Sequence, residues 1–199
     1  MAGNHLTLHT NDRVVVTTSR GNQEKWFDAE KNLWYKVDDG CFEALAEAVS
    51  SEILRNFTNV TRLPGITVAN YWVDTAEVHG LKRVVSVSEN FKREEESLVT
   101  ANTILKNSLG TGYLEVFNRR TSLKERIRLL ADAMEEATGM QDMGAYLTTL
   151  FEIDALFLNQ DRHLNNIALI RDRAGYKPCP IFDCGDSFLL DFALYSPEI

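Results

Sequence analysis

The sequence predicts an α+β fold with two lobes, a β-rich lobe over residues 1–91 followed by a mainly helical lobe over residues 92–199. Short runs of β-branched and aromatic residues dominate the first part, which is typical of strands. After Phe91, apolar residues recur at the i, i+3, i+4 spacing of amphipathic helices. A polar cluster over residues 159–166 then interrupts an apolar helix. We expect a ligand to bind in the cleft between the lobes.

Composition excludes several classes of protein. The 199 residues include 44% apolar and 25% charged side chains, which are proportions of a globular chain that buries its own core. No apolar run approaches the roughly 20 residues needed to cross a bilayer. Three cysteines without a CxxC pair favour a reduced, cytoplasmic protein. The net charge of −8 argues against a nucleic-acid-binding surface, but a few cations and Mg²⁺ suffice to hold a nucleotide.

The first lobe is predicted to contain four strands and one helix. The strands are expected at residues 14–16, 33–37, near 66–73 and at 82–88, where Val, Thr, Tyr and Trp are frequent. A turn follows the second strand, and Asp39 is a candidate cap for a helix over about residues 41–55. The apolar spacing of this helix predicts a buried face made of Phe42, Leu45, Ala46, Val49, Ile53 and Leu54.

The second lobe is predicted to be mainly helical. Leu98, Ala101, Ile104 and Leu105 form one apolar stripe that ends at Gly110. The sequence from Ser122 to Glu125 has the form of a capping box and begins a helix that continues to Gly139. Residues 143–158 are apolar on most sides, which indicates a central helix, and two strands are expected at residues 167–170 and 176–182.

The polar cluster in LFLNQDRHLNN carries the main chemical signal. Asp161 and Asn166 are five residues apart across a tight loop, so both side chains are candidates to face one cavity. A carboxylate there can accept a proton from a hydroxyl, and an amide oxygen is a ligand that Mg²⁺ accepts. Asp183, in IFDCG, ends a strand and would complete the metal site. Asp-x₄-Asn followed by Asp-x-Gly is the spacing of phosphotransfer loops. The alternative is an ordinary helix-to-hairpin turn with Asx caps.

Phosphate transfer also needs a phosphate-binding loop and a lysine near the start of the chain. Residues 17–25 are small and polar and contain Gly21, but they form neither GxGxxG nor a Walker motif. Lys36 lies inside a predicted strand, where a lysine is commonly only a solvated side chain. Glu43 and Glu47 in the next helix are candidates to hold Lys36 toward phosphates, although solvated positions explain both equally well.

Taken in order, five segments resemble the motifs of HipA-like kinases, a family of bacterial serine/threonine kinases that includes toxins of toxin–antitoxin pairs. GNQEKW at 21–26 is similar to the family's GxQxK phosphate loop, and WYKV contains Lys36 at the place of its strand lysine. ENF at 89–91 resembles the hinge that holds adenine. NQDRHLNN and IFDCG resemble the catalytic loop and the segment of the metal-binding aspartate, and NxDRHxxN is the most specific of the five.

The resemblance implies a bilobal protein-kinase-like fold that binds ATP and Mg²⁺ and phosphorylates a protein serine or threonine, with an antitoxin as a candidate partner. Asp161 would orient or deprotonate the substrate hydroxyl, and His163 would brace the loop. Asn166 and Asp183 would hold Mg²⁺. The residues implied in ATP binding are Gly21, Asn22, Gln23, Lys25, Lys36, Glu89 and Phe91. Thr18, or Ser19 beside it, matches the position that is autophosphorylated in some family members.

Three features depart from the family pattern. The chain begins almost at the phosphate loop, without the extra N-terminal subdomain of longer members, and we expect the C-lobe to be incomplete because the chain stops soon after Asp183. Cys184 follows this aspartate where protein kinases usually have phenylalanine. Two alternatives therefore stay open: a kinase of a small molecule or lipid headgroup, and a nucleotide-binding pseudokinase that acts through a partner.

Overall fold

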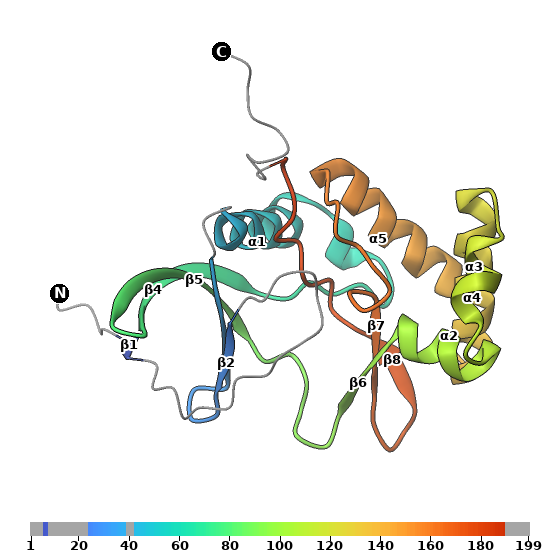
Figure 1. The fold of residues 1–199 in the computed structure, drawn as a ribbon, viewed down its shortest axis with the longest axis horizontal. Coiled ribbons are helices and arrows are strands. Elements are labelled where there is room, and N and C mark those ends of the chain that lie inside the picture. The colour runs from blue at the N-terminus through green and yellow to red at the C-terminus, as the bar shows by residue number, and fades with distance from the viewer. Residues whose placement is uncertain (1–5, 8–23, 39–41, 190–199) are drawn as a thin grey trace, which may run out of the picture.

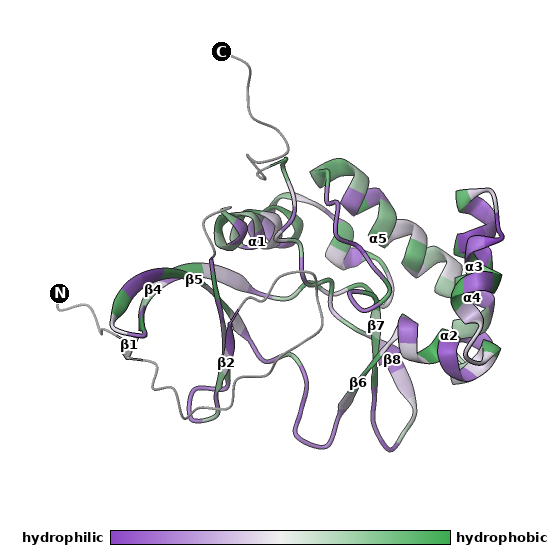
Figure 2. Ribbon diagram, viewed as in Figure 1, coloured by the Kyte–Doolittle hydropathy of each residue, from purple (hydrophilic) through white to green (hydrophobic). Residues whose placement is uncertain are grey.

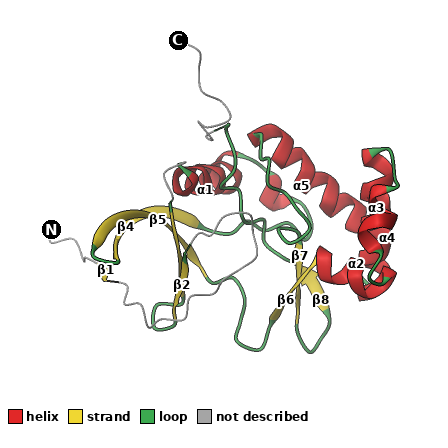
Figure 3. Ribbon diagram, in the orientation of Figure 1, coloured by secondary structure: helices red, strands yellow, loops and turns green. Residues whose placement is uncertain are grey.

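The computed structural model describes residues 6–7, 24–38 and 42–189 and arranges them in two lobes (Figure 1). The N-lobe holds most of the strands with one helix against them, and the remaining helices gather in the C-lobe (Figure 3). The predicted fold class is therefore confirmed. The strand expected at residues 14–16, the proposed Asp39 cap and most of the expected phosphate loop lie outside the described residues.

A five-stranded sheet forms the body of the N-lobe, in the order β1-β4-β5-β3-β2. Its strands are β1 (Leu6–Thr7), β2 (Lys25–Asp28), β3 (Leu33–Val37), β4 (Tyr71–Val78) and β5 (Leu81–Glu89). β1 pairs with β4 in parallel, and the other neighbours are antiparallel. Alternate residues of these strands are buried together, including Trp26, Tyr35, Val85 and Val87. This two-residue period sends the intervening side chains, among them Lys36, to the opposite face of the sheet.

Helix α1 (Glu43–Glu52) was predicted in place, but its predicted buried face is only partly right: Ala46 and Leu54 are buried, and Phe42 and Leu45 are not. Phe42 and Leu45 are 49% and 48% exposed, whereas Glu47, Ser50 and Ser51 are buried. The inward face carries small and polar residues because it meets polar groups there: the Cys184 amide donates to Glu47 Oε2 at 2.9 Å. α1 continues into a π-helical turn (Ile53–Phe57) and a 3₁₀ turn (Val60–Arg62).

The strand predicted near residues 66–73 is also misplaced, because β4 begins only at Tyr71. The preceding segment instead lies against the chain just before Asp183. Val68 forms an isolated parallel bridge with Ile181, and the Ala69 amide donates to the Ile181 carbonyl at 3.0 Å. A short β-branched segment can be buried beside another chain segment as well as within a sheet. The composition of residues 66–73 therefore did not distinguish these two arrangements.

The described part of the C-lobe contains a small antiparallel sheet and four helices. The sheet is formed by β6 (Ser97–Thr100), β7 (Ala168–Arg171) and β8 (Tyr176–Pro178). The helices are α2 (Ala101–Leu109), α3 (Tyr113–Asn118), α4 (Leu123–Thr138) and α5 (Met143–Phe157).

Local signals explain where these elements begin and end. Leu98, predicted in a helix, lies in β6, because the Thr100 side chain caps α2 by accepting from the Thr103 amide at 3.2 Å. The predicted Ser122 cap of α4 is confirmed at 3.2 Å from the Glu125 amide. The strand predicted to reach Phe182 ends at Pro178, since proline lacks the donor that a sheet ladder needs.

Helix α5 lies at the centre of the C-lobe core and carries the loop that follows it. Figure 2 shows α5 as largely apolar or neutral, whereas α4 presents hydrophilic residues on its outer side. Leu147, Leu150 and Phe157 of α5 are buried in the same apolar cluster as residues of α4 and β7, which anchors the start of the polar loop at residue 159. Among the described helices, none has the length and apolar character required to cross a membrane.

Candidate active site

A cavity of about 190 Å³ lies where the two lobes meet. β2, β3, α1, β4 and β5 supply one side, and the segments around Phe91 and Phe182 supply the other. Its polar lining includes Lys25, Lys36, Glu47, Ser86, Ser88 and Asp183, and its aromatic lining includes Trp34, Tyr71, Phe91 and Phe182. An apolar cavity with a few charges gathered at one end fits a ligand with a flat ring and an anionic tail.

The charges at that end are organised around Lys36. Its Nζ lies 3.3 Å from Asp183 Oδ1 and 3.8 Å from Glu47 Oε1. The three side chains come from β3, from the segment after Ile181 and from α1, so both lobes contribute to one ionic cluster. Of the two glutamates predicted as partners of the lysine, Glu47 forms the ion pair, and Glu43 adds a weaker attraction.

The cluster keeps Lys36 and Asp183 charged. Burial by itself lowers the pKa of Lys36, but the carboxylates of Asp183 and Glu47 outweigh it and hold that pKa above its usual value. Burial raises the pKa of Asp183, and the opposing cations Lys36, Lys25 and Arg162 hold it well below its usual range. Burial raises the pKa of Glu47 to about 7, with the attraction of Lys36 only partly opposing it.

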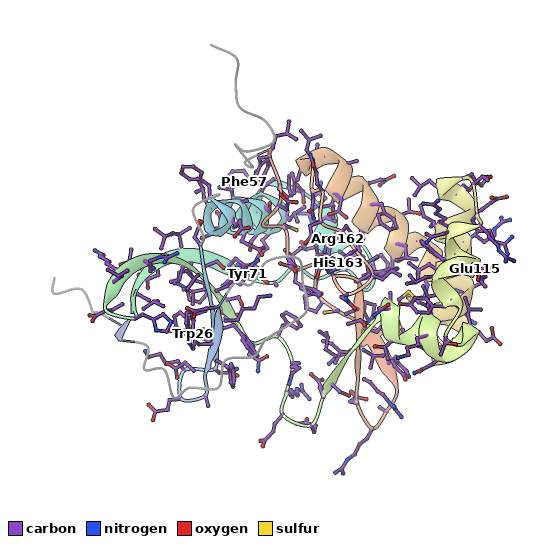
Figure 4. All side chains as sticks on the ribbon, in the orientation of Figure 1. Trp26, Phe57, Tyr71, Glu115, Arg162 and His163 are labelled. Atoms are coloured by element: carbon purple, nitrogen blue, oxygen red, sulfur yellow. The ribbon has the colours of Figure 1, made fainter. Side chains whose placement is uncertain are left out.

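Lys25 and Tyr71 border the same cluster. Lys25 is the cross-strand partner of Lys36 in the β2–β3 ladder, so both lysines face the cavity. Burial and then the charge of Lys36 lower the pKa of Lys25, against the attraction of Asp183. Tyr71 contacts the backbone amide of Asp183, and burial together with Glu47 and Asp183 raises the pKa of its hydroxyl well above the usual value. Figure 4 shows Tyr71 at the inner end of the N-lobe.

The loop after α5 brings Asp161 and Asn166 together. Asn166 Nδ2 donates to the Asp161 carbonyl at 3.0 Å, and the Asp161 amide donates to Asn159 Oδ1 at 3.1 Å. The Asp161 side chain is 32% exposed, so its carboxylate is accessible to a ligand. The backbone of the loop is thus fixed by its own polar residues, while the carboxylate at its tip stays accessible.

His163 lies in the same loop on a different side. Its backbone amide donates to the Asp161 carbonyl at 2.9 Å, and its Nε2 lies 3.8 Å from Asp161 Oδ2. The ring borders a second cavity, of about 290 Å³, between α4, α5 and the loop. Figure 4 places His163 beside Arg162 near the centre of the molecule. Neither ring nitrogen has a hydrogen-bond partner among the described residues, so the supporting role implied by the resemblance stays a prediction.

Arg162, which we did not single out from the sequence, has the densest set of contacts in the site. Its guanidinium donates to both carboxylate oxygens of Asp154 at 2.9 and 3.0 Å. It also donates to the carbonyls of Asn166 and Phe182 at 2.9 and 2.8 Å. Arg162 therefore joins helix α5, the loop at residues 159–166 and the segment that contains Asp183.

The segment predicted as a hinge connects β5 to β6. Phe91 lines the cavity and packs against Phe182, with ring centroids 5.8 Å apart. The Asn90 side chain is fixed at the start of β3, because its Nδ2 donates to Asn32 Oδ1 at 3.1 Å and its Oδ1 accepts from the Trp34 indole. Glu89 ends β5, and its exposed carboxylate accepts from Asn70 at 3.3 Å. Of the predicted hinge residues, Asn90 and Phe91 thus line the cavity, whereas Glu89 does not.

The donor set fits a magnesium ion. Asp183 supplies a carboxylate that stays ionised, and the Asn166 amide nitrogen is already bonded to Asp161, which leaves the amide oxygen as the ligand atom. Mg²⁺ typically takes one or two such protein oxygens and completes its shell with phosphates and water. Five other predicted site residues, Thr18, Ser19, Gly21, Asn22 and Gln23, lie outside the described residues.

Comparison with known proteins supports the fold. No family model matches the sequence, and no curated protein sequence matches it. Among solved structures, the chain is similar to the crystal structure of a Helicobacter pylori proinflammatory kinase, CtkA, with a TM-score of 0.62 and 18% sequence identity. The match covers 92% of this chain and 60% of that kinase, so the chain spans three fifths of its length. The protein has a kinase-like fold. The cavity described above lies between the two lobes of this fold.

Proposed function

We propose that the protein is a kinase that uses ATP and Mg²⁺ to phosphorylate serine or threonine hydroxyls of a protein, as HipA-like kinases do. The observation that carries the proposal is the 3.3 Å contact between Lys36 and Asp183, which joins the two lobes at the charged end of the cavity. Phosphoryl transfer needs a lysine on the phosphates and an aspartate on their metal ion in place together, and this contact brings the two side chains to the same end of the cavity.

Each residue has a defined task in this proposal. Phe91 and the neighbouring cavity wall receive the base, and Lys36 and Lys25 contact the phosphates. Asp183 and Asn166 hold Mg²⁺, which when bound would neutralise charge on the phosphates. Asp161 orients the acceptor hydroxyl and accepts its proton. Catalysis then consists of positioning and charge stabilisation rather than covalent chemistry by the protein.

Without a nucleotide, the ion pair between Lys36 and Asp183 keeps both side chains ionised. A buried lysine or aspartate left unpaired costs several kcal/mol, so each serves as the counter-charge of the other. On binding Mg·ATP, phosphate oxygens would replace Asp183 as the partner of the Lys36 ammonium, and Mg²⁺ would replace Lys36 as the partner of the Asp183 carboxylate. The site exchanges one balanced set of charges for another, which keeps the cost of binding low.

The resemblance to HipA-like kinases extends the proposal to partners. Toxins in that family act together with an antitoxin, so we include an antitoxin protein as a regulatory partner and the toxin of such a pair as the biological role. The short NxDRHxxN motif at residues 159–166 and the order of the other motifs support this assignment.

The test is phosphate transfer from γ-labelled ATP to proteins of a bacterial lysate by the purified chain, with Asp161→Ala and Asp183→Ala as inactive references. Labelled protein bands that both variants lack are expected. Labelled metabolites without labelled proteins would instead indicate a small-molecule kinase. A thermal shift with Mg·ATP but no transfer to any acceptor would indicate a pseudokinase, and equal transfer by both variants would contradict the site assignment.

A further inference from the structure

We infer that Arg162 is a positioning residue that sets the geometry of the metal-binding pair Asn166 and Asp183. The inference rests on the proposed function, since it concerns how that site holds Mg²⁺. Arg162 does not itself line the cavity; it lies behind the lining, with its guanidinium between α5 and the two segments that carry the candidate metal ligands.

The first step is that Arg162 is held rigidly from behind. Its side chain is 4% exposed and that of its partner Asp154 is 7% exposed. Nε and Nη2 of the guanidinium donate to the two carboxylate oxygens in the bidentate arrangement that arginine favours. Asp154 also accepts from Asn159 Nδ2 at 2.8 Å, which ties the start of the loop to the same carboxylate. The guanidinium therefore has a fixed position relative to α5.

The second step is that the free edge of the guanidinium spans the two ligand segments. Nη1 donates to the Asn166 carbonyl at 2.9 Å and to the Phe182 carbonyl at 2.8 Å. Phe182 directly precedes Asp183. Arg162 Nη1 therefore links the backbone of Asn166 to the backbone next to Asp183. Nη2 also approaches Cys184 Sγ at 3.4 Å, on the far side of Asp183. Arg162 therefore contacts residues on both sides of that aspartate, the backbone of Phe182 and the side chain of Cys184.

The third step is that stability alone does not require this arrangement. A buried ion pair is often no better for folding than apolar residues of similar volume. The planar fork of arginine, with five donors, is needed only where several acceptors must be held at fixed angles. Replacing Arg162 with lysine would keep the positive charge but remove the planar set of donors. The effect of this replacement therefore separates a positioning role, which needs the geometry, from a merely structural role, which needs only the charge.

The experiment measures the affinity for ATP by calorimetry, with and without Mg²⁺, for the wild type and for Arg162→Lys. Metal-free ATP affinity should stay within about twofold, while the gain in affinity on adding Mg²⁺ should fall about tenfold or more, as is typical when a residue behind a metal ligand is changed. Arg119→Lys, an exposed arginine in the same lobe, is the matched control and should keep the full gain.

A second variant separates positioning from stability. Arg162→Met combined with Asp154→Leu replaces the pair by apolar side chains, and its melting temperature should lie closer to the wild type than that of Arg162→Met alone. The Mg²⁺ gain should nevertheless stay low. Recovery of this gain together with stability, or a full gain in Arg162→Lys, would overturn the inference and leave the proposed function intact. A wild type without any Mg²⁺ gain would overturn the proposed function itself.

Discussion

Lys36 and Asp183 are separated by 147 positions in the sequence, yet Lys36 Nζ and Asp183 Oδ1 lie 3.3 Å apart where the two lobes meet. Each residue is placed by its own lobe, the lysine by the β3 ladder and the aspartate by the segment behind β8. The contact therefore reports whether both lobes have folded and come together. Perturbing it should affect stability and ligand binding at once.

Replacing Lys36 with methionine should lower both the stability of the protein and its affinity for Mg·ATP. The Asp183 carboxylate would then lose its ion-pair partner, which we expect to cost about 3 kcal/mol of unfolding free energy. Affinity for Mg·ATP should fall at least about tenfold because a phosphate contact is lost. Chemical denaturation and calorimetry measure the two effects. Lys31→Met, an exposed lysine in the β2–β3 turn, is the control, and equal behaviour of the two variants would contradict the prediction.

Glu47 should make stability depend on pH between about 4.5 and 7. Its pKa is raised to about 7 by burial, from 4.5, so in this window the folded chain holds a proton that the unfolded chain has released. The stabilisation is complete below pH 4.5 and is lost as the pH rises through 7. The pKa shifts of Lys36 and Asp183 act outside this window.

The test compares the wild type with Glu47→Gln by urea unfolding from pH 5 to pH 8. The glutamine stays neutral, so the stability of the wild type relative to the variant should decline over this range, by about 3 kcal/mol at most. Glu52→Gln, at the exposed end of the same helix, is the matched control. A difference that stays constant or grows with pH would show that the Glu47 carboxyl is not neutralised by burial.

Asp161→Asn should abolish transfer without unfolding the protein. The backbone of Asp161, not its side chain, makes the bonds to Asn159 and Asn166 that hold the loop, so the variant should melt like the wild type. Loss of the group that accepts the hydroxyl proton should lower the rate of phosphate transfer about a hundredfold to ten-thousandfold. Asp132→Asn, exposed on α4, is the control. Unchanged transfer in Asp161→Asn would assign this task to another residue.

Ser122→Ala should destabilise α4 while leaving the cavity unaltered. The serine hydroxyl accepts from the Glu125 amide at 3.2 Å, and loss of such a cap costs about 1 kcal/mol. The melting temperature of a chain of this size should fall by about 2–4 °C, and calorimetry with Mg·ATP should give the wild-type affinity. The exposed neighbour Thr121→Ala should not change the melting temperature measurably. A similar fall in both variants would mean that the cap is not responsible.

The sequence predicted those elements of the fold whose signals are local. β3 occupies the predicted residues, and α4 begins at its predicted cap, because strand composition and capping act over a few neighbouring positions. The inward face of α1 was misassigned in part because hydrophobic periodicity does not register that Glu47 is buried against Lys36, a residue of strand β3. Leu98 was misassigned because a strand that pairs with β7 precedes the helix without any break in the apolar pattern.

Within the candidate site, the same distinction separates what was predicted from what was missed. Asp161, Asn166 and Asp183 stand in short motifs, so they were recognisable without a structure. Arg162 stands in the same loop, but its role depends on Asp154, eight positions earlier on α5. The sequence feature that pointed to it was Asp154, because an acidic residue on the inward face of an apolar helix needs a cationic partner. Nothing in the sequence identified which cation that is.

The pairing of Lys25 with Lys36 makes the length of one short turn critical. The two lysines share a face of the sheet because residues 29–32 close the β2–β3 hairpin in the register that sets Asp28 opposite Leu33. Deleting or inserting one residue there would shift the ladder by one position and turn one lysine away from the cavity. Substitutions in this exposed turn should be well tolerated during evolution, whereas changes in its length should be eliminated.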